Sequence, residues 1–257
     1  MDINNSRPMN KIENMLRGSS KESEIDIVEA KPMKTNKPVL LTGFPDMGMI
    51  GVAAASYVIS GLKMEEAGYL KSRFIPSVKL IVGSEFRNLS SFRIYKNPSG
   101  DVLVILNDNP TGLMGITPFF SDIGKTLADW FDKKEVRLVI ALGSFLLQKD
   151  EKSSLVAYTM DSERREDLMK LGIQPLQQGV IGGLVVSIID ECTERKIPWL
   201  MLFAPAKKIG EVDNEGVLMV IDGINKIMGL NIEVPSLTQK VTQKGERQKG
   251  LRSLMRR

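Results

Sequence analysis

Short apolar runs alternate along this chain with segments in which apolar residues recur every three or four positions. Runs such as Val39–Gly43, Val102–Leu106 and Val136–Leu142 show no polar alternation, which is typical of strands that are covered on both faces. The spacing of apolar residues over Asp213–Met228 instead predicts an amphipathic helix. This alternation predicts an α/β fold, a three-layer α/β/α sandwich with a largely parallel or mixed sheet.

The same pattern gives the remaining elements and the domain boundaries. Strands are predicted at 39–43, 67–70, 78–82, 92–95, 102–106, 136–142, 155–159 and 199–203. Helices are predicted at 48–62, 118–131, 162–171, 182–195 and 213–228. Residues 1–35 mix charged and polar types and are expected to form a flexible N-terminal segment, residues 36–237 the α/β domain, and residues 238–257 a basic, disordered tail.

The first predicted strand ends in a glycine-rich turn that leads directly into a helix of small residues. The residues of this turn that we single out are Gly43, Phe44, Pro45, Asp46, Gly48 and Gly51. A Walker loop would end in Gly-Lys-Ser/Thr, and this turn contains no lysine. The dinucleotide fingerprint needs a glycine where Asp46 stands. Two interpretations remain, a nucleotide site and a turn that allows close strand–helix packing, and the second is favoured.

Loops that follow the strands are where an α/β domain carries its function. Here they are residues 44–47, 107–112, 143–147 and 205–208, with the glycine-rich segment 179–183 alongside.

The charged residues in these loops that we single out are Asp46, Asp108 and Lys207, which form an alternative ligand site. Asp108 and Lys207 are candidates for a carboxylate–ammonium pair or for holding a small ligand. Ordinary turn chemistry also explains Asp and Asn at such bends, and it is the favoured interpretation.

Composition narrows the chemistry further. The chain has no histidine and one cysteine, Cys192, so histidine-based triads, the usual catalytic zinc sites and internal disulfides are excluded. Cys192 falls on the apolar side of a predicted helix, which favours a buried thiol over a nucleophile. Chemistry on carboxylates, lysine or magnesium stays open, so catalysis is disfavoured and not excluded, and we predict no catalytic residue, metal or cofactor. No apolar run is long enough for a membrane helix and no signal-peptide core is present, so a cytoplasmic protein is expected.

The positive charge is concentrated at the C-terminus. Residues 236–257 contain seven basic residues and one acidic residue, a net charge of +6, whereas the whole chain carries +4. Such a tail is a solvated chain end or contacts an acidic protein surface or nucleic acid. Because it lacks the interleaved aromatic residues of a single-strand binder, an acidic protein surface is favoured over nucleic acid.

Two segments carry a family resemblance. The run Leu41–Gly51, followed by Leu62–Gly68, resembles the N-terminal signature of the proteasome assembly chaperone family, with Asp46 in place of the usual glycine and Ile50 in place of the usual valine. Downstream, the turn around Gly179, Gly182 and Gly183 and the closing residues 230–232 resemble the family's second glycine turn and its C-terminal end.

This resemblance implies an α/β/α sandwich related to nucleoside-phosphorylase-like folds and a homo-oligomer. It also implies a non-enzymatic role, in which the protein binds α subunits of the 20S proteasome or a paralogous chaperone and assists ring assembly. The alternative is a nucleoside- or nucleotide-binding enzyme of phosphorylase-like or ATP-grasp-labelled type.

The last four residues bear on the implied partner. Proteasome binders of several kinds end in a hydrophobic residue, a tyrosine and any final residue, whose carboxylate is captured. This chain ends Leu254–Met255–Arg256–Arg257, so Met255 suits the hydrophobic position, Arg257 supplies the carboxylate and Arg256 stands where the tyrosine belongs. We expect a mobile arm that strengthens partner binding without being its sole source.

Overall fold

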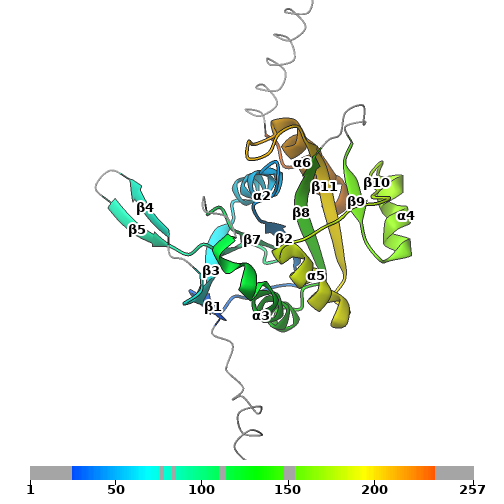
Figure 1. Cartoon of the computed structure of the whole chain (residues 1–257). Coiled ribbons are helices and arrows are strands. Elements are labelled where there is room, and N and C mark those ends of the chain that lie inside the picture. Colours follow the sequence, from blue (N-terminus) through cyan, green and yellow to red (C-terminus); the bar gives the residue numbers. More distant parts are fainter. Residues whose placement is uncertain (1–24, 76–77, 83–84, 110–113, 147–153, 235–257) are drawn as a thin grey trace, which may run out of the picture.

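The structure is a computed structural model that describes residues 25–75, 78–82, 85–109, 114–146 and 154–234 (Figure 1). A nine-stranded mixed sheet forms its centre, and its strands are β1 (Ile25–Glu29), β2 (Val39–Gly43), β3 (Glu65–Ser72), β6 (Arg93–Lys96), β7 (Val102–Leu106), β8 (Leu138–Leu146), β9 (Val156–Tyr158), β10 (Gln174–Pro175) and β11 (Trp199–Ala206). The helices are α2 (Ile50–Gly61), α3 (Phe120–Lys133), α4 (Ser162–Lys170), α5 (Leu184–Glu194) and α6 (Asn214–Met228), with a 3-10 helix η1 (Met114–Phe119).

The strand order is β1-β3-β6-β7-β2-β8-β11-β9-β10. The four central strands β7, β2, β8 and β11 run parallel, and the outer strands add mostly antiparallel pairs. A separate hairpin, β4 (Val78–Val82) and β5 (Glu85–Leu89), projects away from the main sheet (Figure 1). β2 ends at Gly43, opposite Leu142 of β8. β8 continues for four more residues, over which it pairs with β11 alone among the described strands.

Two apolar layers hold the helices against the sheet, as expected for strands that are buried on both faces. Alternate residues of the central strands, such as Leu41 and Ile140, pack with α2 and α6 on one face. The intervening residues, such as Leu40 and Val139, pack with α3 and α5 on the other face (Figure 1). The predicted α/β sandwich with a mixed sheet is therefore confirmed.

The predicted elements from residue 39 to residue 228 recur with shifted ends, and β2, β4 and β7 match their predicted bounds. Differences occur where pairing, and not apolar content, extends a strand. β8 and β11 continue beyond their predicted ends because they pair with each other as far as Leu146 and Ala206. The short strand β5 was not predicted, because its residues Glu85–Leu89 are mostly polar and gain strand structure by pairing with β4.

The N-terminal boundary also differs from the expected one. β1 lies inside the segment that the sequence suggested to be flexible, and it pairs antiparallel with β3 over five residues. Ile25 and Met33 are both buried. The folded domain therefore begins earlier than residue 36, while the expected boundary at 237 lies outside the described residues.

A charged cluster fastens this N-terminal segment to α3. The Glu29 carboxylate accepts hydrogen bonds from Trp130 Nε1 at 2.9 Å and from the Met33 amide at 2.7 Å, and it lies 2.7 Å from Lys134 Nζ. Burial alone would raise the pKa of Glu29, but the hydrogen bonds from Lys134, Trp130 and Met33 outweigh it and hold that pKa below its ordinary value. The ionised form of Glu29 is therefore the one that stabilises the fold.

We predict that Glu29→Gln lowers the free energy of unfolding at pH 7 by about 1–2 kcal/mol, because the charge-assisted bonds are lost. The stabilisation by a carboxylate with a depressed pKa is complete above its unfolded pKa, near 4.5, and is lost as the pH falls through the folded pKa. Urea unfolding from pH 7 downward should therefore show the two proteins converging in acid. Asp26→Asn, an exposed change on the same strand, is the control, and an equal loss in both variants would contradict the prediction.

Candidate functional site

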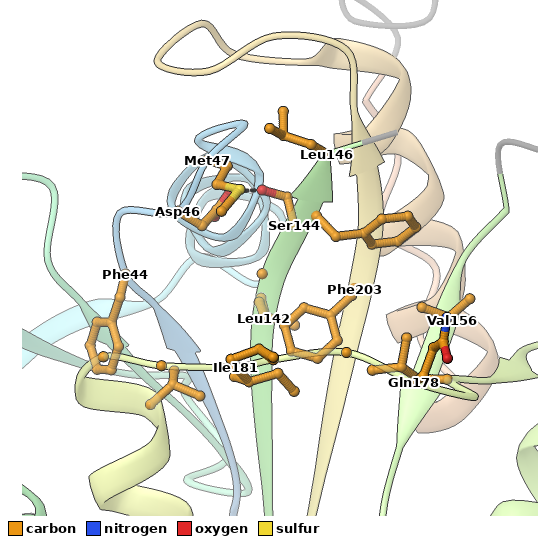
Figure 2. A pocket seen from close by; sticks show the side chains of 18 of the residues that line it. Phe44, Asp46, Met47, Leu142, Ser144, Leu146, Val156, Gln178, Ile181 and Phe203 are labelled. Atoms are coloured by element: carbon orange, nitrogen blue, oxygen red, sulfur yellow. Dashed lines mark hydrogen bonds between the residues drawn. The ribbon is translucent and has the colours of Figure 1, made fainter. Parts of the chain in front are cut away.

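The β2–α2 turn is closed by the side chain of Asp46. Its Oδ1 accepts hydrogen bonds from the amides of Gly48 and Ile50, both at 3.1 Å, and its Oδ2 accepts one from the amide of Gly51 at 2.6 Å. The Ser144 hydroxyl, at the end of β8, donates a further hydrogen bond to Oδ1 (Figure 2). The carboxylate therefore lies at the N-terminus of α2, where the helix dipole favours a negative charge.

This arrangement bears directly on the phosphate interpretation. A phosphate at such a turn would be bound by the amides that open the helix. In this chain the amides of Ile50 and Gly51 already donate to Asp46, and the amide of Gly48 donates to both Asp46 and Ser144 Oγ. The turn thus holds its own anion, and a second negative group would meet the Asp46 charge.

The three glycines of this turn are required for close packing. A Cβ atom on Gly43 would lie 2.4 Å from Ala55 Cβ, and one on Gly48 would lie 2.5 Å from Ala206 Cβ. A Cβ on Gly51 would lie 2.8 Å from the backbone oxygen of Leu142. These contacts bring β2, α2 and the ends of β8 and β11 to a separation that side chains would not allow, so the favoured interpretation of the motif, tight packing, agrees with the geometry.

The second glycine turn differs in kind. Nothing lies within 4 Å of a Cβ on Gly182 or Gly183, and a Cβ on Gly179 would make only an ordinary contact with Leu176. Gly183 precedes α5 with φ 88°, a conformation that L-residues rarely adopt. Within the described part of the chain, the backbone groups of residues 177–182 make no hydrogen bond. This second turn is therefore open to solvent where the first is closed.

Between the two turns lies a cavity of about 810 Å³, which we call the carboxyl-end cavity because the central strands end there (Figure 2). Phe44 and Phe203 come from strand ends, and Ile181 comes from the open segment, which crosses β8 and β11 in Figure 2. Asp46 is the one charged side chain among the described residues that line the cavity. The full lining is Phe44–Met47, Leu142–Leu146, Ser154, Val156, Pro175–Val185 and Phe203.

Apolar side chains are also exposed around the cavity. Met47 is half exposed and Val180 is fully exposed, and both lie at its rim. The β11–α6 loop lies against the first turn, since the amide of Gly210 donates to the Met47 oxygen at 2.8 Å. It adds two further exposed apolar residues to this end of the molecule. We call the whole set the carboxyl-end surface, and it comprises Met47, Leu146, Val180, Ile209 and Val212.

The three residues of the alternative ligand site have separate partners. Asp108 forms an ion pair with Arg93, and Lys207 forms one with Glu215. Asp46 accepts hydrogen bonds from the first amides of α2. The structure therefore does not pair Asp108 with Lys207, which was one of their candidate roles, because each has an opposite charge closer to its own element.

The remaining candidates add no chemistry to this site. Cys192 is buried, as its place on the apolar side of a helix predicted, and burial raises the pKa of its thiol to about 12. The described residues contain no group of histidine, cysteine or carboxylate side chains suited to a metal, and no helix among them is long and apolar enough to span a membrane. The tail residues 254–257 lie outside the described part of the chain.

The sequence located this site better than it identified the residues that form it. Three of the loops singled out beforehand, 44–47, 143–147 and 179–183, contribute to the cavity. Ser144 and Phe203 were missed as individual residues. Ser144 follows Gly143 at the end of a predicted strand, so its place at the strand end was visible in the sequence, but its partner Asp46 is 98 residues away.

We predict that Asp46→Ala lowers the free energy of unfolding by about 1–3 kcal/mol, because it leaves the first amides of α2 without their acceptor. Ser144→Ala removes one hydroxyl and should have an effect of about 1 kcal/mol. Urea denaturation of the two variants beside the unmodified chain measures both values. An Asp46→Ala protein as stable as the unmodified one would contradict the capping role.

We also predict opposite outcomes for alanine in the two glycine turns. Gly51→Ala should destabilise by about 1–3 kcal/mol, because the new Cβ must displace the backbone of β8. Gly182→Ala should change stability by less than about 0.5 kcal/mol, because the site is open. Thermal unfolding of the matched pair is the measurement, and equal effects would show that packing does not distinguish the two turns.

Comparison with known proteins finds a family match and several similar solved structures. Residues 40–248 match the PAC2 family. A crystal structure from Thermoplasma acidophilum, of a protein with unknown function, superposes with a TM-score of 0.70 and 27% identity over 100% of both chains. PbaA of Pyrococcus furiosus, an archaeal homolog of proteasome-assembly chaperone, superposes with a TM-score of 0.73 and 21% sequence identity. The match covers 90% of this chain and 93% of PbaA. PbaB of the same organism, an archaeal proteasome activator, superposes with a TM-score of 0.71 and 18% sequence identity. The match covers 90% of this chain and 100% of PbaB.

The family match covers most of the chain and includes both glycine turns. It confirms the resemblance that these turns indicated in the sequence. The chain therefore belongs to the PAC2 family.

Proposed function

We propose that this protein is a non-enzymatic chaperone that binds α subunits of the 20S proteasome, or a paralogous chaperone, and assists assembly of the α ring. The observation that carries the proposal is the carboxyl-end surface. An α/β enzyme gathers charged and polar groups where its parallel strands end. Here that end exposes Met47, Val180 and Ile209 around an apolar cavity, which suits contact with another protein.

Two similar folds support the choice of partner. PbaA is described as a homolog of proteasome-assembly chaperone and PbaB as a proteasome activator. Both names connect the fold with the proteasome, although in different roles. Membership of the PAC2 family extends the same connection to this chain.

The enzyme alternative finds less support in the geometry. A nucleotide-binding protein would need free amides or a positive group at the first turn. Asp46 occupies those amides, and Asp108 and Lys207 are held by Arg93 and Glu215. The described lining of the cavity contains no lysine or arginine to hold a phosphate.

The proposal has three further parts. The protein acts in the cytoplasm as a homo-oligomer, which places several copies of the carboxyl-end surface in one assembly. Residues 236–257 act as a basic arm that strengthens binding through an acidic partner surface. Direct capture of the terminal carboxylate contributes less, since Arg256 replaces the penultimate tyrosine.

Binding to purified 20S proteasome α subunits tests the proposal, with the full chain and a variant lacking Ser236–Arg257 compared over a salt series. We expect both proteins to bind, and the truncated one to bind more weakly at low salt and about equally at high salt, because screening removes the contribution of the arm. Native mass spectrometry of the α subunits should show more rings in the presence of the chain.

Failure of the full chain to bind either α subunits or a paralogous chaperone, with no increase in ring formation, would overturn the proposed function. Identical affinities of the two proteins at every salt concentration would remove the arm alone. Calorimetry with nucleotides and magnesium serves as the control for the enzyme alternative, and tight binding of one compound would favour that alternative.

A further inference from the structure

We propose that the carboxyl-end cavity binds an extended, uncharged segment of a protein partner, with apolar side chains inside the cavity and the main chain along residues 177–182. This inference rests on the proposed function, since it assigns the site through which a partner protein is held. Three properties of the cavity carry it, namely its size, the absence of free charge and the unpaired backbone at its rim.

The size of the cavity exceeds the need of one small side chain. Its volume of about 810 Å³ falls in the range of sites that enclose a ligand of several groups. Phe44 and Phe203 provide flat aromatic surfaces, and Leu142, Ile181 and Leu184 provide aliphatic ones. Such a lining favours two or three neighbouring apolar side chains over a polar metabolite.

The one charged group in the described lining is already hydrogen-bonded. The Asp46 carboxylate accepts three amide hydrogen bonds and one from Ser144, so both of its oxygens are occupied by neutral donors. The described lining holds no basic side chain. An acidic segment would meet the Asp46 charge, and a basic segment would lose its hydration at oxygens that are already hydrogen-bonded, so the site favours an uncharged segment.

The open segment provides the main-chain part of the site. Residues 177–182 run across β8 and β11 beside the cavity, and their amides and carbonyls have no hydrogen bond within the described chain (Figure 2). An extended peptide satisfies such groups by strand addition, as in other peptide-binding domains. Gly182 and Gly183 leave space for the approach of a second backbone.

The chain's own C-terminal residues fit this site less well. Leu254 and Met255 are apolar, but Arg252, Arg256 and Arg257 surround them. Three positive charges within six residues conflict with a cavity that offers no unpaired carboxylate. The segment is therefore assigned to a partner, and the tail enters the test as a competitor.

Methyl NMR of the full chain tests the assignment with a blocked peptide, acetyl-Ser-Leu-Phe-Leu-Ser-amide, as the probe. We expect shifts at Met47, Val180 and Ile181, and none at Val58 or Ile232, which lie elsewhere in the core. The same peptide with its central amides N-methylated should bind about tenfold more weakly or worse, because it cannot pair with residues 177–182. A peptide of residues 248–257 should bind more weakly than the blocked probe.

The matched variants are Val180→Asp and Met160→Asp. Both residues are exposed, so both proteins should fold, but only Val180 lines the cavity. Val180→Asp should weaken peptide binding about tenfold or more, and Met160→Asp should leave it unchanged. The inference is overturned if the probe leaves the cavity methyls unshifted, or if benzene binds but the peptide does not. It is also overturned if N-methylation has no effect or if the tail peptide binds more tightly than the probe. Equal loss of binding in both variants would overturn it as well.

Its failure is separable from failure of the proposed function. If α subunits bind the Val180→Asp protein as tightly as the unmodified chain, the assignment of the cavity is wrong and the proposed function stands. If the peptide binds as expected but α subunits do not, the cavity is correct and its partner is another protein.

Discussion

The Asp46 carboxylate is the contact on which the rest of this architecture depends. It joins β2, in which the turn begins, to the first amides of α2, and through Ser144 it joins both to β8. A carboxylate at a helix N-terminus is stabilised by the dipole and by the amides that point at it. Because the acceptor is covalently part of the turn, the helix needs no bound anion to satisfy its first turn.

The closed turn sets the distances around it. With Asp46 in place, Gly43, Gly48 and Gly51 bring the backbone of α2 against the ends of β8 and β11. Those two strands continue beyond β2, and their extra residues form a wall of the carboxyl-end cavity. The cavity is thus a consequence of unequal strand lengths at the centre of the sheet, covered on one side by a packed turn and on the other by an open one.

The sequence predicts most of the fold and the general place of the site. Continuous apolar runs identify β2 and β7 within their observed bounds, and helical spacing identifies α6, whose first predicted residue, Asp213, is its N-cap in the structure. What the sequence does not predict depends on contacts between distant residues. β1 is stabilised by β3 and by the contacts of Glu29 with α3, and none of these leaves a periodic signal in the residues of β1 itself.

The same limit applies to the site. Asp108 is bound by Arg93 and not by Lys207, a choice that depends on which strand ends are neighbours. Residues 177–182 are likewise open because no other described segment forms hydrogen bonds with their backbone, and local composition does not predict this. Loops after parallel strands can therefore be identified from the sequence, while the structural role of each loop cannot.

Two glycine-rich turns at the same end of one sheet perform opposite structural tasks. In the first turn the absence of side chains allows backbone-to-backbone packing, and Asp46 takes the place of a ligand. In the second turn it leaves the backbone accessible, and Val180 is presented to solvent at the rim of an apolar cavity. The filled anion position and the accessible main chain are the two features on which the proposed binding of an extended segment rests, since an extended chain supplies both apolar side chains and backbone hydrogen bonds.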